Sequence, residues 1–439
     1  MSHPQDWTLR AQAEALRKGE LSAVALLEAT LERLHARDAP LNSTPVIFDE
    51  ESRDALAHAP AGALHGVPLT VKDMFALPWR AARNATHFDL IPASASGPYR
   101  NLRDAGAIVV GVANQHELGI GSTGTASAYG VMKNPWNLEH CAGGSSGGSA
   151  AGVAARLVAG SLGSDSGGST RIPASYCGVV GLKVTYGAVP YDGYFGSSTT
   201  FSAPGLLARD GGDTRVLASA LLQRPLSAQS GSGLRIGVVR DPYWDDADPE
   251  VADACERAMR DAGWHVSTVH LENAELASAA YLGRIVAEVG LLSNDLLASL
   301  SPASRALVLA GMLSPARFVP RADRVRSAIR GALARLLQAV DFIALPSTPT
   351  CAPPLNDTWV TLPSGRISVD VANVRQSCLV NLTGVPSISV PVGLSRSGLP
   401  IGLQLIAPWG NESRLLDAAE HLERSSDRQY VDLVPSAAS

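Results

Sequence analysis

The chain has 439 residues, of which 46% are hydrophobic and 18% are charged, and its net charge is −5. This profile is ordinary for a globular protein with a large core, and the weakly acidic balance excludes the basic surface expected of a nucleic-acid-binding protein. No apolar run in the sequence approaches the roughly 20 residues that span a bilayer. We therefore expect neither a nucleic-acid partner nor a membrane partner.

Cysteine and histidine spacing exclude two further classes of protein. The five cysteines form no CxxC pair and no short disulfide framework, and the first ten residues lack the apolar core of a signal peptide. A reducing cytoplasm is the expected location. The ten histidines form no HxH or HExxH spacing, so we expect no metal and no other cofactor.

Hydrophobic periodicity predicts helices and strands that alternate along the chain. Two N-terminal helices are expected within residues 8–37, separated at Gly19, with Ser22 as the N-cap of the second. The other expected elements, in chain order, are strands at 67–71 and 107–112, a helix at 149–159, a strand, helix and strand at 234–240, 249–262 and 265–270, strands at 341–345, 387–392 and 402–406, and a helix at 412–424.

This alternation predicts an α/β layered core in a single domain. Its expected parts are the N-terminal helices, a catalytic core at about residues 60–210, a variable helical region at about 227–335, and C-terminal core elements at about 340–435.

Two glycine- and serine-rich segments, residues 143–149 and 165–169, have two interpretations. Such tracts are commonly flexible linkers. Here an alanine-rich helix is predicted between them, and an apolar stretch follows the second one. Because linkers are not expected to pair across a packed helix, a catalytic interpretation is favoured.

The residue types in these segments suit acyl transfer. Glycines allow close backbone approach to a substrate, and successive N–H groups can converge on an oxyanion. A serine hydroxyl is a nucleophile that needs a nearby base. His116 and His140 are the nearest histidines in sequence, but neither lies in a comparable motif. Lys72 is one of only four lysines among 36 basic residues, and it ends an apolar strand, where desolvation favours the neutral amine.

Two other serine-hydrolase patterns fit less well. Residues 143–147 match the GxSxG nucleophile elbow, but residues 137–141 before them are not predicted to form a strand. No lysine lies in an SxxK motif.

Several motifs together resemble the amidase signature family. They span nearly the whole chain, in the family's order: residues 66–73, 134–137, 143–149, 165–171, 177–183, 347–349 with 352–354, 381–387 and 400–406.

The resemblance implies the family fold, a central mixed twisted β-sheet covered by α-helices on both sides. It also implies a triad in which Ser169 is the nucleophile, Ser145 the bridging serine after a cis Gly144–Ser145 peptide, and Lys72 the base. The oxyanion hole would be formed by the N–H groups of Ser166, Gly167, Gly168 and Ser169. No cofactor is implied.

The resemblance also suggests roles around this triad. The loop containing Gly119, Gly121 and Thr123 matches a segment that lines the acyl site in the family, so it is expected to contact substrate. The residue types of Asp165 and Arg171, which flank the nucleophile loop, favour support of that loop by an ion pair over the alternative, contact with a polar substrate group. Cys177 is expected to be a buried small residue rather than a nucleophile. Lys183 is likewise expected to be structural.

Three functions remain open at this stage. The first is an amidohydrolase that cleaves small-molecule linear amides, carbamates or related esters through an acyl-enzyme. The second is the glutaminase subunit of a tRNA-dependent amidotransferase complex, for which the chain is somewhat short. The third, a binding or scaffold protein, is disfavoured by the intact triad residues. Family members often form homodimers, so a homodimer is a further expectation.

Overall fold

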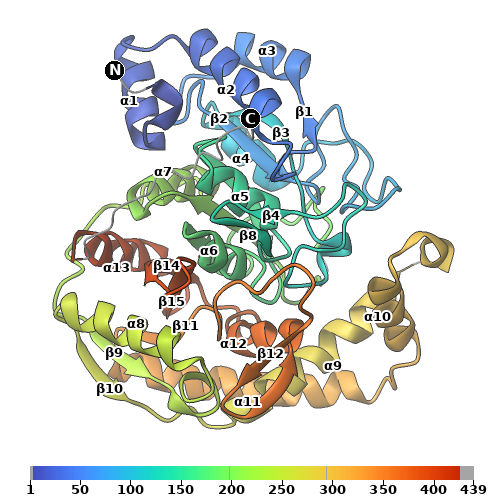
Figure 1. The fold of residues 1–439 in the computed structure, drawn as a ribbon, viewed down its shortest axis with the longest axis vertical. Coiled ribbons are helices and arrows are strands. Elements are labelled where there is room, and N and C mark those ends of the chain that lie inside the picture. Colours follow the sequence, from blue (N-terminus) through green and yellow to red (C-terminus); the bar gives the residue numbers. More distant parts are fainter. Residues whose placement is uncertain (1–2, 197, 293, 426–439) are drawn as a thin grey trace.

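The structure, a computed structural model, describes residues 3–196, 198–292 and 294–425. Within these ranges a central sheet of eleven strands runs through the molecule (Figure 1). Strand pairing is mixed: β2 is parallel to β3 and β6, whereas β6 and β8 are antiparallel. The order of strands in the sheet is β1 (Val46–Ile47), β3 (Ile108–Ala113), β2 (Pro68–Lys72), β6 (Gly160–Asp165), β8 (Ala203–Ala208), β7 (Val180–Lys183), β14 (Ser387–Leu394), β15 (Pro400–Ile406), β11 (Phe342–Pro346), β9 (Arg235–Val238) and β10 (His265–Thr268).

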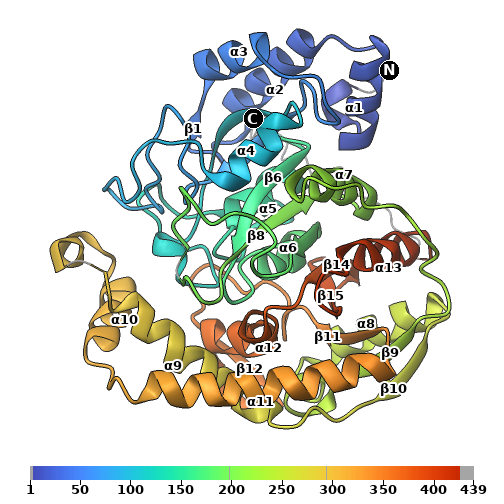
Figure 2. The same ribbon diagram turned by 180° about the vertical axis from the view of Figure 1, so that it is seen from behind.

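Helices cover both faces of this sheet. The helices α5 and α6 lie in front of it in Figure 1, whereas α4 and α11 are in front in the reverse view of Figure 2. The helices are α1 (Leu9–Lys18), α2 (Ala23–Arg37), α3 (Asp49–Ala57), α4 (Gly97–Asp104), α5 (Gly147–Ala154), α6 (Arg171–Cys177), α7 (Gly211–Leu221), α8 (Pro249–Asp261), α9 (Ala277–Val289), α10 (Pro302–Met312), α11 (Phe318–Ala339), α12 (Val369–Thr383) and α13 (Glu412–Ser425).

The expected fold class is confirmed, and local sequence explains its most regular parts. Every residue of β2 and β3 is buried, as expected for strands that are covered on both faces. Ser22 caps α2 by accepting from the N–H of Ala25, as predicted. Of the expected C-terminal elements, residues 426–435 lie outside the described residues.

Two local predictions were wrong. Residues 137–141 do form a strand, β5 (Asn137–Cys141), which pairs with β4 (Lys133–Asn134) in a ribbon separate from the central sheet. Most residues of β5 are polar and partly exposed, so this strand lacks the apolar run by which a buried strand is predicted from sequence. The helix expected at residues 149–159 begins and ends earlier than predicted, since α5 spans Gly147–Ala154.

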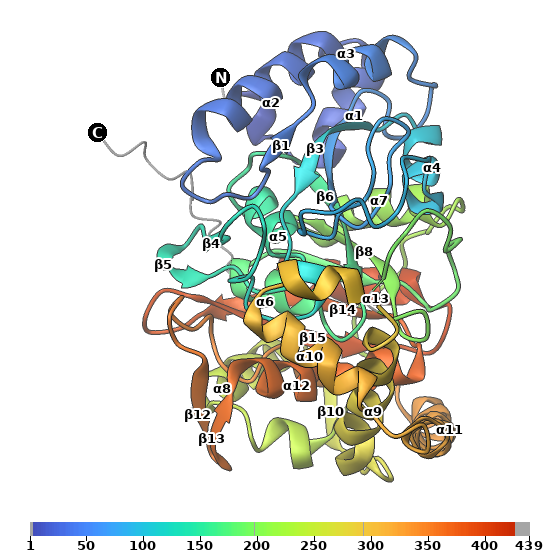
Figure 3. The same cartoon turned by 90° about the vertical axis from the view of Figure 1, so that its right-hand side faces the viewer.

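A second ribbon and the helices α9 and α10 complete the surroundings of the site. The ribbon consists of β12 (Trp359–Leu362) and β13 (Gly365–Ser368) and leads directly into α12. Helices α9 and α10 pack against one another along one side of the molecule (Figure 3). Within the described ranges, no helix combines the length and the apolar character that crossing a bilayer requires.

Candidate active site

Lys72 lies at the end of β2 and is completely buried. Its Nζ is 2.7 Å from Ser145 Oγ and 2.9 Å from Ser164 Oγ. Burial lowers the pKa of this amine to about 7, although the negative charge of Asp165 opposes that effect. Near neutral pH the amine is therefore poised to accept a proton.

Ser145 is held in a tightly packed turn before α5. The Gly144–Ser145 peptide is cis, as the resemblance implied, and Gly143 has a φ of 81°. A Cβ on Gly144 would lie 2.6 Å from the carbonyl oxygen of Gly121, so only glycine fits there. The turn thereby fixes the Ser145 hydroxyl against Lys72.

Ser169 precedes α6 and is 8% exposed, on the wall of a cavity. Its carbonyl oxygen accepts from the N–H of Ser146 at 3.1 Å, which joins its loop to the residue after Ser145. Within the described part of the chain, Ser169 Oγ has no hydrogen-bond partner. The structure thus brings Lys72 and Ser145 into contact and leaves the Ser169 hydroxyl facing the cavity.

The loop that carries Ser169 is braced by a buried ion pair. Asp165 and Arg171 are both fully buried and 2.9 Å apart. Burial alone would raise the pKa of Asp165, but the Arg171 guanidinium holds it well below its usual range. Asn381, on α12, donates to Asp165 and accepts from Arg171, so the pair is hydrogen-bonded from a third side. This network fits the expected supporting role of both residues.

Asp165 also occupies one of the N–H groups expected in the oxyanion hole. The N–H of Gly168 donates to Asp165 Oδ1 at 2.8 Å. The N–H groups of Ser166, Gly167 and Ser169 are therefore the better candidates for oxyanion donors, and all three residues line the cavity.

Replacing Asp165 with asparagine should destabilise the protein by about 3–5 kcal/mol, because it leaves the buried Arg171 charge without its carboxylate. We expect the melting temperature to fall by roughly 5 °C or more and labelling of Ser169 by a fluorophosphonate to slow. Glu272→Gln is the matched control, because Glu272 and Arg335 form an exposed pair that should contribute less than about 1 kcal/mol. Equal melting temperatures of the two variants would contradict the supporting role.

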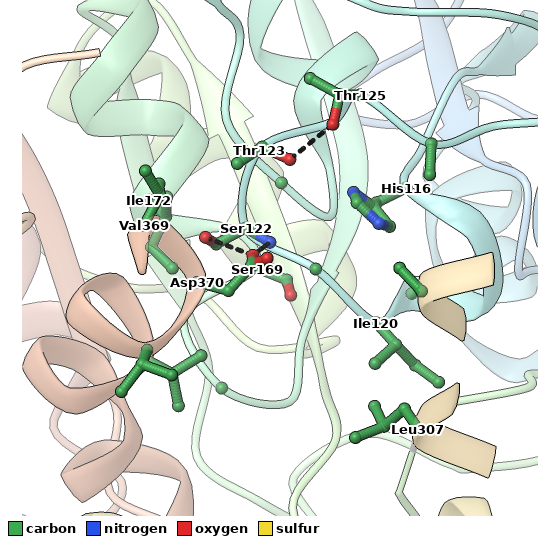
Figure 4. A pocket seen from close by; sticks show the side chains of 18 of the residues that line it. His116, Ile120, Ser122, Thr123, Thr125, Ser169, Ile172, Leu307, Val369 and Asp370 are labelled. Atoms are coloured by element: carbon green, nitrogen blue, oxygen red, sulfur yellow. Dashed lines mark hydrogen bonds between the residues drawn. The ribbon is translucent and has the colours of Figure 1, made fainter. Parts of the chain in front are cut away.

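The cavity beside Ser169 measures about 420 Å³. The expected substrate-contact residues Gly119, Gly121 and Thr123 all line it, and Figure 4 shows Ile120 and Leu307 on one side and Val369 and Ile172 on another. Its wall also includes apolar residues of α9 and α12. Among the described residues that line it, two are carboxylates, Asp357 and Asp370, and none is Lys or Arg.

Four residues in and around the site were not predicted from the sequence, namely Ser164, His116, Asp370 and Asn381. The contact of Ser164 with Lys72 results from strand pairing. Val71 in β2 is opposite Leu162 in β6, which brings Lys72 beside the end of β6. One partial signal existed for Asn381, since it lies within the motif at residues 381–387 that carried the family resemblance. Asp370 had no such signal.

His116 is a cavity residue rather than a second base. Burial lowers the pKa of its imidazole, and its Nδ1 accepts from the N–H of Gly124 at 3.2 Å. The ring is consequently neutral, with its proton on Nε2.

Two other residues have structural surroundings, as expected. Lys183 Nζ donates to the carbonyl oxygens of Val184 and Val385, both at 2.9 Å. Cys177 is buried, its thiol donates to the carbonyl oxygen of Ala142, and burial raises its pKa. Within the described ranges, no group of three or more His, Cys, Asp or Glu residues is placed to hold a metal ion.

Comparison with known proteins gives consistent results over the whole chain. A family model described as amidase matches residues 25–416. One subunit of the glutamyl-tRNA(Gln) amidotransferase from Methylococcus capsulatus is 32% identical, over 96% of this chain and 97% of that protein.

Solved structures agree with this assignment. One described as an amidase has a TM-score of 0.90 and 32% identity, covering 95% of this chain and 99% of its own. A 6-aminohexanoate cyclic dimer hydrolase in complex with substrate has a TM-score of 0.87 and 27% identity, covering 99% of this chain and 100% of its own.

Proposed function

The chain belongs to the amidase signature family and is an amidase, and from that premise we propose that it hydrolyses small-molecule amides with Ser169 as nucleophile, Ser145 as relay and Lys72 as base. The observation that carries this proposal is the 2.7 Å contact between Lys72 Nζ and Ser145 Oγ in a buried site next to the cavity serine Ser169. A neutral lysine is the base that this serine pair requires.

The proposed reaction proceeds through an acyl-enzyme. Ser169 gives its proton to Ser145, which passes one to neutral Lys72, and Ser169 Oγ attacks the carbonyl carbon. Backbone N–H groups of residues 166, 167 and 169 stabilise the oxyanion. Ser145 then protonates the leaving nitrogen, and water hydrolyses the ester bond to Ser169.

The cavity favours substrates without a carboxylate. A buried or partly buried carboxylate needs a cationic partner, and the described lining residues supply none. The mostly apolar wall suits aryl or alkyl amides, with carbamates and related esters chemically admissible.

A second candidate function is the glutaminase step of a tRNA-dependent amidotransferase. The sequence relative from Methylococcus capsulatus carries that name, and such relatives support this candidate more strongly than a free-standing amidase. Against it stands the cavity: free glutamine carries an α-carboxylate, and the described lining residues include no Lys or Arg to pair with it.

A substrate panel separates the two candidates. We expect the purified chain alone to hydrolyse one or more anilides, short aliphatic amides, carbamates or esters at least about tenfold more efficiently, in kcat/KM, than glutamine. Product release would be compared with and without proteins that copurify with the chain. Glutamine hydrolysis that appears only with a copurified partner, with no turnover of the other substrates, would overturn the first function in favour of the second.

A further inference from the structure

Asp370 presents a carboxylate to the cavity from the first turn of α12. The N–H and the hydroxyl of Ser122 both donate to its Oδ1, at 2.6 and 2.8 Å. Asn373 donates to Ser122 Oγ at 3.1 Å and so fixes the orientation of that serine. Within the described residues Oδ2 accepts no hydrogen bond, and the side chain is exposed to the cavity (Figure 4).

The segment that holds Asp370 packs against the catalytic turn. The carbonyl oxygen of Gly121, next to Ser122, lies where a Cβ on Gly144 would be only 2.6 Å away. On the other side of this turn, the N–H of His116 donates to the carbonyl oxygen of Ser145 at 3.0 Å. Ser122, Asp370 and Ser169 all line the same cavity, and Figure 4 shows the hydrogen bonds that join Ser122 to Asp370. The carboxylate therefore belongs to the cavity that a substrate bound at Ser169 must fill.

The charge of Asp370 has no cationic counterpart among the described residues that line this cavity. His116 is neutral, as its hydrogen bond from Gly124 requires. The other acidic side chain among the described lining residues is that of Asp357. Much of the remaining wall is apolar.

We propose that Asp370 is a specificity residue that selects amides carrying a cationic group, such as an alkylammonium, on a part of the molecule remote from the scissile bond. The free Oδ2 would accept a charge-assisted hydrogen bond from that group, and the same carboxylate would repel a substrate carboxylate. This inference rests on the proposed amide hydrolysis at Ser169 and names the substrate class of that site.

Three amides of matched length test this selection: hexanamide, its ω-amino derivative and its ω-carboxylate counterpart. For the wild-type protein we expect kcat/KM, measured by ammonia release, to be at least about tenfold higher for the ω-amino than for the ω-carboxylate compound. Asp370→Asn should lower that ratio by about tenfold. Asp253→Asn, which makes the same charge change on an exposed position of α8, should not lower it. A wild-type ratio near one, or a ratio that falls in Asp357→Asn and not in Asp370→Asn, would overturn the proposal.

A binding measurement keeps this test separate from that of the proposed function. Hexylammonium should protect Ser169 from fluorophosphonate labelling at lower concentration than hexanol, and hexanoate should protect least. Asp370→Asn should remove the difference between hexylammonium and hexanol. If Ser169 is labelled but hexylammonium protects no better than hexanol, the selection by Asp370 is wrong and the nucleophile assignment stands. If Ser169 is not labelled at all, the proposed function fails and this inference fails with it.

Discussion

Replacing Ser169 with alanine should lower amide turnover by about 10⁴-fold or more, because the acyl-enzyme can no longer form. A residual rate above that in water is expected, since the cavity and the N–H groups of the nucleophile loop remain in place. The measurement is kcat on the best substrate of the panel, together with intact-mass detection of a fluorophosphonate adduct. The adduct should form on the wild-type protein and be absent from the variant.

Ser149→Ala is the matched control for this loss. Ser149 lies on α5, only four residues after Ser145, and it is fully buried. Its hydroxyl has no hydrogen-bond partner among the described residues, so its removal should leave turnover and melting temperature near those of the wild type. A Ser169→Ala protein that turns over substrate as fast as Ser149→Ala would place the nucleophile elsewhere.

The elements that could be predicted from the sequence are those in which the local pattern of apolar and polar residues shows which side chains are buried. The strand β3 is a continuous apolar run, β2 has mostly apolar residues before Lys72, and the helices α1 and α2 have clear caps. The strand β6 was missed because Gly160–Asp165 contains a single large apolar side chain, Leu162. Its strand conformation follows from pairing with β2 on one side and β8 on the other, which local propensity cannot reveal.

The candidate site likewise contains residues that the sequence could predict and residues that it could not. Lys72, Ser145 and Ser169 were predicted because each lies in a motif with a recognisable pattern, and the structure brings the first two into contact. Asp370 is hydrogen-bonded to Ser122, which lies 248 positions away in the sequence, and Asn381 is hydrogen-bonded to Asp165, 216 positions away. Such pairs depend on how α12 packs against the nucleophile loop, so no local pattern could identify the contacts, although Asn381 itself lies in a motif of the family.

For the wild-type protein, kcat/KM should rise about tenfold per pH unit up to about pH 7 and then level off. The pKa of Lys72 is lowered to about 7 by burial, and only the neutral amine can take the proton that Ser169 gives up through Ser145. The fraction of neutral Lys72 therefore falls as the pH falls below 7, and activity falls with it. Lys72→Met should lower kcat/KM by roughly 10²–10⁴-fold and leave the residual rate without this pH dependence.

A second buried lysine makes the assignment of this titration testable. Burial also lowers the pKa of Lys183 to about 7, but its Nζ donates to the carbonyl oxygens of Val184 and Val385, not to a serine of the site. Lys183→Gln keeps a hydrogen-bond donor for these carbonyls and removes the titrating amine. Because the proposed proton acceptor is Lys72, this variant should retain the wild-type midpoint near pH 7, measured as the pH dependence of Ser169 labelling. A midpoint that disappears in Lys183→Gln but persists in Lys72→Met would show that Lys72 is not the base.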